Sequence, residues 1–106
     1  MTTFRWLNKQ GVESTDGFVL QSMHRFYYHY IEFDRALKIF VEPCRTSSGG
    51  YYEEVLIASN PIWEAPNEAL PLSAVERSRI QDNVAAALQF MGIQHKFVGL
   101  GAGAKA

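Results

Sequence analysis

The strongest local signal in this chain of 106 residues is a single amphipathic helix near its C-terminal end. Ser73-Ala74-Val75-Glu76 is a capping box, in which the serine side chain accepts from the Glu76 amide and Glu76 reaches back to the serine amide. Apolar residues then recur at helical spacing and form one stripe: Ile80, Val84, Ala87 or Leu88, and Met91. Because Gly92 stands where a left-handed C-terminal cap belongs, the sequence predicts a helix over Ala74–Met91.

The rest of the chain has the alternation and the turn signals of β-strands. Strands are expected over Thr3–Leu7, Gly17–His24, Phe26–Phe33, Leu37–Glu42 and Tyr51–Ala58, with Ile93–Val98 as a last strand after the helix. Pro43 is expected to end its strand, because proline cannot donate to a ladder. Short connections between consecutive strands predict an α+β fold, a twisted antiparallel meander of about five strands with the C-terminal helix packed on one face.

The length predicts one domain, which we expect over residues 1–98. The Gly/Ala-rich residues 99–106 are expected to form a flexible tail. The register of the aromatic strand stays open. If Asp34-Arg35 is a two-residue loop, Phe26, Tyr28 and Tyr30 share a face with Leu37, Ile39 and Val41. If the loop is one residue longer, Tyr27, His29, Ile31 and Phe33 take their place on that face. In either case one face of this hairpin keeps exposed aromatic side chains unless something covers it.

Charge and cysteine content limit the compartment and the partners. The formal net charge of −1 argues against a dedicated nucleic-acid binder, which normally has a basic face. The lone Cys44 cannot form an internal disulfide and fits a reducing compartment. The first residues lack the apolar run of a signal peptide, and no window approaches the roughly 18 apolar residues of a membrane span. We therefore expect a cytoplasmic protein with no membrane partner.

No catalytic, cofactor-binding or metal-binding residues are predicted, and an enzyme is not expected. His24, His29 and His95 lack the i, i+4 spacing of a helical metal pair, and no cysteine pair accompanies them. Glu53 and Glu54 are adjacent on a strand and point to opposite faces, so they do not form an acid/base pair. Glu32, Glu42 and Glu53 are expected on a solvated sheet face, paired with Lys38 and Arg25.

The sharpest functional signal is an acidic segment rich in proline. Thr46–Glu76 holds five acidic residues and no Lys or Arg, and Ser59–Leu72 holds three of the four prolines. A tryptophan beside an acid on a restrained backbone suits an interface that meets a basic partner. The candidate partner-binding residues are Trp63, Glu64, Glu68, Glu53 and Glu54. In the alternative interpretation, Trp63 folds back as a lid over the sheet edge and the acids are merely solvated.

Two stretches of the sequence resemble a known family. They are Trp6–Ser14 (WLNKQGVES), which leads into Asp16–Val19, and Glu76–Val84 (ERSRIQDNV), which leads into Ala87–Gly92. Together they are similar to small immunity proteins of bacterial polymorphic-toxin and contact-dependent growth inhibition (CDI) systems. The resemblance extends diffusely up to Val98. It implies a cytoplasmic protein that binds one cognate toxin and blocks its active site or an essential surface.

The leading functional hypothesis is therefore a non-enzymatic inhibitor, a monomer that forms a 1:1 heterodimer with the C-terminal domain of a cognate toxin. If Trp63 is an exposed anchor, Trp63→Ala should weaken binding and leave the fold intact. Two alternatives stay open. One is a chaperone for a secreted effector, usually a dimer, and the other is a small ligand-binding domain with a pocket between sheet and helix.

Overall fold

The computed structural model describes residues 2–24, 26–58, 63–67, 69–70 and 72–100. Its elements follow in this order: β1 (Phe4–Asn8), β2 (Gly11–Ser14), β3 (Phe18–His24), β4 (Tyr27–Glu32), β5 (Arg35–Arg45), β6 (Tyr51–Ala58), α1 (Ala74–Met91) and β7 (His95–Leu100). Within these residues, no helix is long and apolar enough to cross a membrane.

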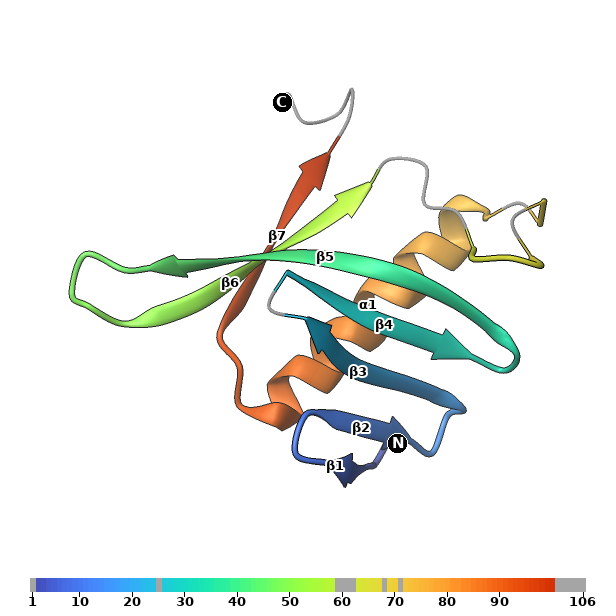
Figure 1. The fold of residues 1–106 in the computed structure, drawn as a ribbon, viewed down its shortest axis with the longest axis horizontal. Coiled ribbons are helices and arrows are strands. Elements are labelled where there is room, and N and C mark those ends of the chain that lie inside the picture. Colours follow the sequence, from blue (N-terminus) through green and yellow to red (C-terminus); the bar gives the residue numbers. More distant parts are fainter. Residues whose placement is uncertain (1, 25, 59–62, 68, 71, 101–106) are drawn as a thin grey trace.

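The strands form one sheet whose spatial order is the order of the chain (Figure 1). Every neighbouring pair is antiparallel except β6 and β7, which run parallel and are joined by α1. The helix packs on one face of the sheet (Figure 1). The α+β class with one helix is therefore confirmed, and the expected meander of about five strands is a sheet of seven, with a parallel last pair.

The strands differ from the sequence prediction mainly at three places. The strand β2 is not predicted, because its four residues are too few for alternation to be recognised. The strand β5 continues through Pro43 to Arg45. The Glu53 amide donates to the Gln94 carbonyl on the β7 side, so the nitrogen of Pro43, its antiparallel partner, points away from β6 and costs the ladder no hydrogen bond. At the other end, β7 reaches Leu100, two residues into the expected tail, and residues 101–106 lie outside the described part of the chain.

The register of the aromatic hairpin puts its tyrosines on the covered face. Tyr30 lies opposite Leu37 and Tyr28 opposite Ile39, which is the face assignment expected for a two-residue loop. The loop itself is Phe33-Asp34, one residue earlier than expected, and Phe33 adopts a left-handed φ of 59°. The faces are unchanged, because an even shift of register keeps side chains on the same side.

Phe40 has a special place in the sheet. The first half of β5 is in register with β4 and the second half with β6. Among the described residues, only Phe40 belongs to both ladders, opposite Tyr27 on one side and Leu56 on the other. Beyond it, β5 stays paired with β6 alone, β7 accompanies β6 as far as Glu53, and the ends of β5 and β6 project from the body of the sheet (Figure 1).

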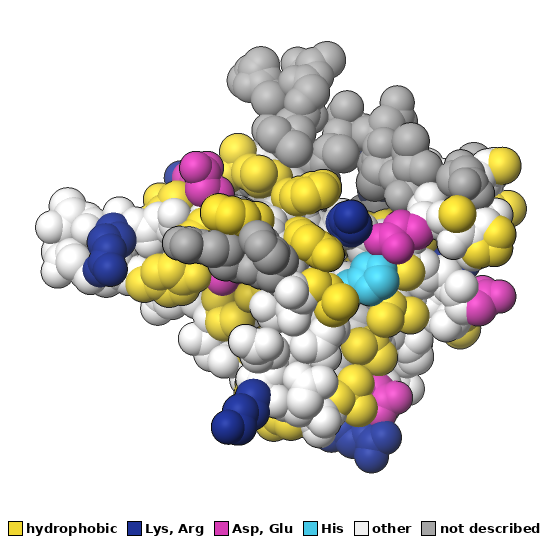
Figure 2. All heavy atoms as spheres, viewed as in Figure 1, with side chains coloured by type: hydrophobic (Ala, Val, Ile, Leu, Met, Phe, Trp, Pro, Cys, Tyr) yellow, Lys and Arg dark blue, Asp and Glu magenta, His cyan; other side chains and the backbone are white. Residues whose placement is uncertain are grey.

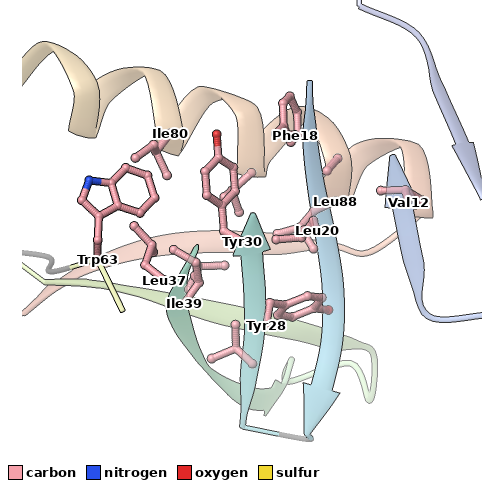
Figure 3. Packing of buried hydrophobic residues seen from close by; sticks show 14 residues of the cluster. Val12, Phe18, Leu20, Tyr28, Tyr30, Leu37, Ile39, Trp63, Ile80 and Leu88 are labelled. Carbon is pink, nitrogen blue, oxygen red and sulfur yellow. The ribbon is translucent and has the colours of Figure 1, made fainter. Parts of the chain in front are cut away.

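The core lies between the sheet and α1 (Figure 3). Its largest fully buried side chains come from five strands, from the helix and from the segment before it: Trp63, Tyr30, Phe18, Leu20, Leu37, Leu88, Val12, Val55 and Val84. The predicted stripe of the helix is buried at Ile80, Val84, Ala87 and Leu88. Burial of this apolar area is the main favourable term of folding.

Polar and aromatic contacts show that α1 crosses the strands from β5 toward β1. Near its first turns, Arg79 donates to the buried Glu32 carboxylate at the end of β4 (2.6 Å). One turn later, the Asn83 amide donates to the Tyr30 hydroxyl (3.0 Å). Near its end, the Phe90 ring lies 5.4 Å from the Phe4 ring of β1. The helix therefore covers the strands of the N-terminal half in turn.

Both predicted caps of the helix are present. The Ser73 hydroxyl accepts from the Glu76 amide (3.1 Å), the Ser73 amide donates to the Glu76 carboxylate (3.0 Å), and Gly92 adopts a φ of 77°. We expect Ser73→Ala to lower the free energy of unfolding by about 1 kcal/mol, since one amide at the start of the helix loses its acceptor. Urea unfolding followed by circular dichroism measures this, with Ser78→Ala as the control on an exposed helical serine. Equal midpoints for the two variants would contradict the capping role.

The same cap predicts a dependence on pH. The hydrogen bond from the Ser73 amide holds the pKa of the Glu76 carboxyl below its ordinary 4.5. A lowered pKa stabilises the fold above the ordinary value, and this contribution is lost as the pH falls through the pKa of the folded state. Wild type should therefore melt above Glu76→Gln at pH 7, and the difference should shrink below about pH 4.5. A difference that grows on acidification would contradict this assignment.

Candidate partner-binding surface

The face of the sheet that points away from α1 has an unusual composition. An antiparallel sheet with one solvated face normally alternates apolar-in and polar-out. Here four side chains on the outer face form one row across four adjacent strands, which we call the apolar row: Tyr27, Phe40, Leu56 and Val98. Figure 2 shows this open face, with hydrophobic side chains gathered over its middle.

Phe40 is the most prominent member of the apolar row. It is 48% exposed, and the other three are partly buried. The Tyr27 and Phe40 rings contact each other, with centroids 6.0 Å apart. Aromatic side chains cover a large area with few rotatable bonds, which is why they are enriched in binding surfaces. The row is therefore a rigid apolar strip open to solvent.

A basic row borders the apolar row on one side. His29 and Lys38 lie opposite each other on β4 and β5, one pleat from Tyr27 and Phe40. The Lys38 ammonium lies 5.0 Å from the centre of the Tyr27 ring, which favours a cation–π contact. The ring of His29 lies 3.0 Å from the Glu64 carboxylate. Figure 2 shows one histidine between an acidic and a basic side chain on this face.

An acidic row borders the other side. Glu42 and Glu54 are a direct register pair across β5 and β6, and Lys96 is the register neighbour of Glu54 on β7. Their alternating neighbours Val41 and Val55 are buried against the helix side, so both carboxylates lie on the open face. Within the described part of the chain, no ion pair joins Glu42, Glu54 or Lys96 to another side chain.

One pleat beyond the acidic row lie Cys44 and Tyr52, which again face each other. A hydrogen bond between the two side chains raises the pKa of the Tyr52 phenol. The open face of β5 and β6 thus changes from apolar to acidic to weakly polar toward the projecting ends of the two strands.

The structure separates the five residues predicted to bind a partner. Glu54 and Glu64 lie on the open face, and Glu68 lies outside the described residues. Glu53 and Trp63 lie on the covered face instead. The opposite directions of Glu53 and Glu54 follow from strand alternation, as the sequence predicted.

Trp63 is a core residue rather than an exposed anchor. It is 1% exposed and packs beside Leu37 and Ile80 (Figure 3). The Arg35 guanidinium lies 4.5 Å from the centre of its ring. The next residue crosses to the other side of the sheet, where the Glu64 amide donates to the Ala36 carbonyl of β5 (2.7 Å). This agrees with the alternative interpretation, in which Trp63 closes the sheet edge.

Both buried carboxylates of the covered face have partners. Glu53 accepts from the hydroxyls of Tyr28 and Tyr51 (2.8 Å each), and burial together with this carboxylate raises the pKa of the Tyr28 phenol. Glu32 accepts from Tyr30 and forms ion pairs with Arg79 and Arg35. The sequence analysis expected strand acids on a solvated face, and these two are exceptions, because tyrosine and arginine donors offset the cost of burying their charge.

A second exposed aromatic group lies at the far edge of the sheet, on the covered side. Trp6 of β1 (49% exposed) and Phe90 of α1 (43% exposed) contact each other, with ring centroids 5.7 Å apart. The sequence analysis quoted Trp6 only for its resemblance. Helical spacing alone places Phe90 beside the predicted stripe, so its position at the edge follows only from the packing of α1 on β1.

Among the described side chains, His29, His95 and Cys44 do not converge. His95 bonds the Ile93 carbonyl through Nδ1 (3.0 Å), and His29 bonds Glu64. In the part of the chain that the structure describes, no group of three or more His, Cys, Asp or Glu side chains could hold a metal ion.

Comparison of the chain with known protein families, with curated proteins and with solved structures gives no match.

The burial of Trp63 predicts a stability effect. Trp63→Ala should lower the free energy of unfolding by about 3–5 kcal/mol, because it removes a full indole from the core. Trp6→Ala, the same change at a half-exposed position, should cost less than about 1 kcal/mol. Denaturant unfolding of both variants measures the difference. Similar stabilities would show that the segment around Trp63 does not close the core.

Proposed function

We propose that this chain is a non-enzymatic immunity protein. It binds a cognate bacterial toxin domain and neutralises it by covering the active site or another essential surface of that domain. The resemblance of Trp6–Ser14 and Glu76–Val84 to small immunity proteins supports the class, and the open face supports binding as its means.

The observation that carries the proposal is the apolar row. A solvated sheet face gains nothing in the free protein from exposing Phe40 beside Tyr27 and Leu56, and contiguous apolar surface of this kind marks sites of protein association. Four strands at about 4.8 Å spacing give the row a length of about 14 Å. That is enough for a central contact ringed by polar residues.

The arrangement suits inhibition by occlusion. The row stands on hydrogen-bonded strands and not on a loop, so little conformational entropy is lost when a partner covers it. The charged rows on either side provide a polar rim, which mainly sets orientation and association rate. No chemistry on the toxin is needed, because inhibition follows from the covered area alone.

The acidic residues predicted from the sequence take different roles in this proposal. Glu54 and Glu64 belong to the rim on opposite sides of the apolar row. Trp63 and Glu53 act from beneath the sheet, by holding β5 and β6 in place. The protein would act in the cytoplasm, as a monomer that forms a 1:1 complex.

A chaperone for a secreted effector is the second candidate. The exposed pair Trp6 and Phe90 favours it, because a second aromatic surface could join two copies into the dimer typical of such chaperones. The mass of the free protein in solution separates the two. A monomer supports the immunity protein, and a dimer that dissociates on Trp6→Ala supports the chaperone.

Phe40→Ala tests the proposed surface. We expect it to weaken binding to the C-terminal toxin domain encoded by the upstream neighbouring gene by about 30-fold, the effect of losing a central aromatic contact. The matched control is Phe33→Ala, which removes the same ring from a 76% exposed position in the hairpin loop. Titration calorimetry gives affinity and stoichiometry, and a toxicity assay gives neutralisation.

Two outcomes contradict the proposal in different ways. If wild type does not bind the toxin domain or fails to neutralise it, the chain is not its immunity protein. If wild type binds and Phe40→Ala binds as Phe33→Ala does, the protein recognises the toxin through another surface.

A further inference from the structure

The open face carries two like charges side by side, to which the described residues supply no ion-pair partner. Glu42 and Glu54 stand directly opposite each other on neighbouring strands. Like charges in this position repel and destabilise a sheet. Within the described residues, no cation forms an ion pair with either carboxylate, although both carboxylates on the covered face have several donors.

Lys96 does not offset the repulsion between Glu42 and Glu54 through an ion pair. It neighbours Glu54 alone, in the parallel ladder on the side away from Glu42, and no ion pair within 4.0 Å joins the two. A cation supplied from above the sheet would meet both carboxylates at once. As far as the described residues show, the two acids are therefore open to a cation from outside the molecule.

The acidic row also has a fixed place relative to the apolar row. Two residues along a strand span about 7 Å, so Glu42 lies about that far from Phe40, and Glu54 about that far from Leu56. On the opposite side, at the same spacing, lie Lys38 and His29. The surface is thus apolar in the middle, with two carboxylates together on one flank and, on the other flank, Lys38 beside the His29–Glu64 contact.

From this pattern, and on the basis of the proposed function, we propose how the toxin domain docks. It places an apolar side chain against Phe40 and Leu56 and, about 7 Å away, a Lys or Arg between Glu42 and Glu54. Charge complementarity favours this orientation, because the reversed pose would bring the cation against Lys38, on the flank where Glu64 already contacts His29. The toxin surface that is blocked is then basic at this point.

The arrangement predicts opposite effects on stability and on binding. In Glu42→Gln/Glu54→Gln the cross-strand repulsion disappears, so the free protein should melt about 2 °C higher at low salt. The same variant should bind the toxin domain about tenfold more weakly, mainly through a slower association rate, and the loss should diminish at high salt. A purely structural role of the two acids would not produce both effects.

The control is a double variant that changes the net charge by the same amount at positions away from the acidic row. Asp34→Asn/Asp82→Asn also removes two exposed negative charges, from the hairpin loop and from the helix. It should bind within about twofold of wild type, because neither substituted residue contacts the toxin in the proposed docking. Surface plasmon resonance with the toxin domain at two salt concentrations, and thermal melts of the free variants, complete the experiment.

The outcomes are distinct. A tenfold loss confined to the Glu42/Glu54 variant, with a higher melting temperature, supports the docking. If wild type binds tightly and both double variants bind alike, the acidic row is not the cation site and the docking is wrong, while the immunity function stands. If wild type itself does not bind, the proposed function fails and this inference fails with it.

Discussion

The whole molecule depends on one constraint, which is that a single helix must cover a sheet of seven strands. An 18-residue helix is about 27 Å long, and six strand spacings span about 29 Å. One helix can therefore cover one face and nothing of the other. The chain meets this limit by laying α1 across the strands from β5 toward β1 and by adding Trp63 where the helix begins. All large buried side chains gather on that side, and the other face is left to serve a different purpose.

Burial sorts the acidic residues of the two faces. On the covered side a carboxylate is tolerated only with donors around it, and Glu32 and Glu53 have tyrosine or arginine partners from distant parts of the chain. These bonds also tie β4 to the helix and to β6. On the open side water screens the charges, so Glu42 and Glu54 can stand side by side with no ion pair to another described residue. Water screens the charges of the open face, whereas carboxylates of the covered face need donors from the protein. The carboxylates of the open face are therefore available for recognition.

Local signals predicted the parts of this structure that depend on local physics. The capping box, the stripe and Gly92 defined α1 to the residue, because each acts within one or two helical turns. Strand alternation likewise separated Glu53 from Glu54. The position of Trp63 was not predictable, since proline and acidic neighbours look alike in an exposed loop and in a segment that closes an edge. The apolar row was also hidden, because it joins Tyr27, Phe40, Leu56 and Val98 across four strands and exists only once three registers are known. Sequence alternation showed only that some aromatic side chains would face outward.

The position of Phe40 has a mechanical consequence. As the residue shared by the two ladders of β5, it lies at the seam between the β1–β4 half of the sheet and the ribbon formed with β6 and β7. Because Phe40 is the one described residue that belongs to both ladders, we expect relative twisting of the two halves to concentrate there. A partner bound on the apolar row contacts both halves and would restrain their relative motion. Binding would then slow amide hydrogen exchange far beyond its own footprint, in β4 and β6 alike, and the sheet would become stiffer as a unit.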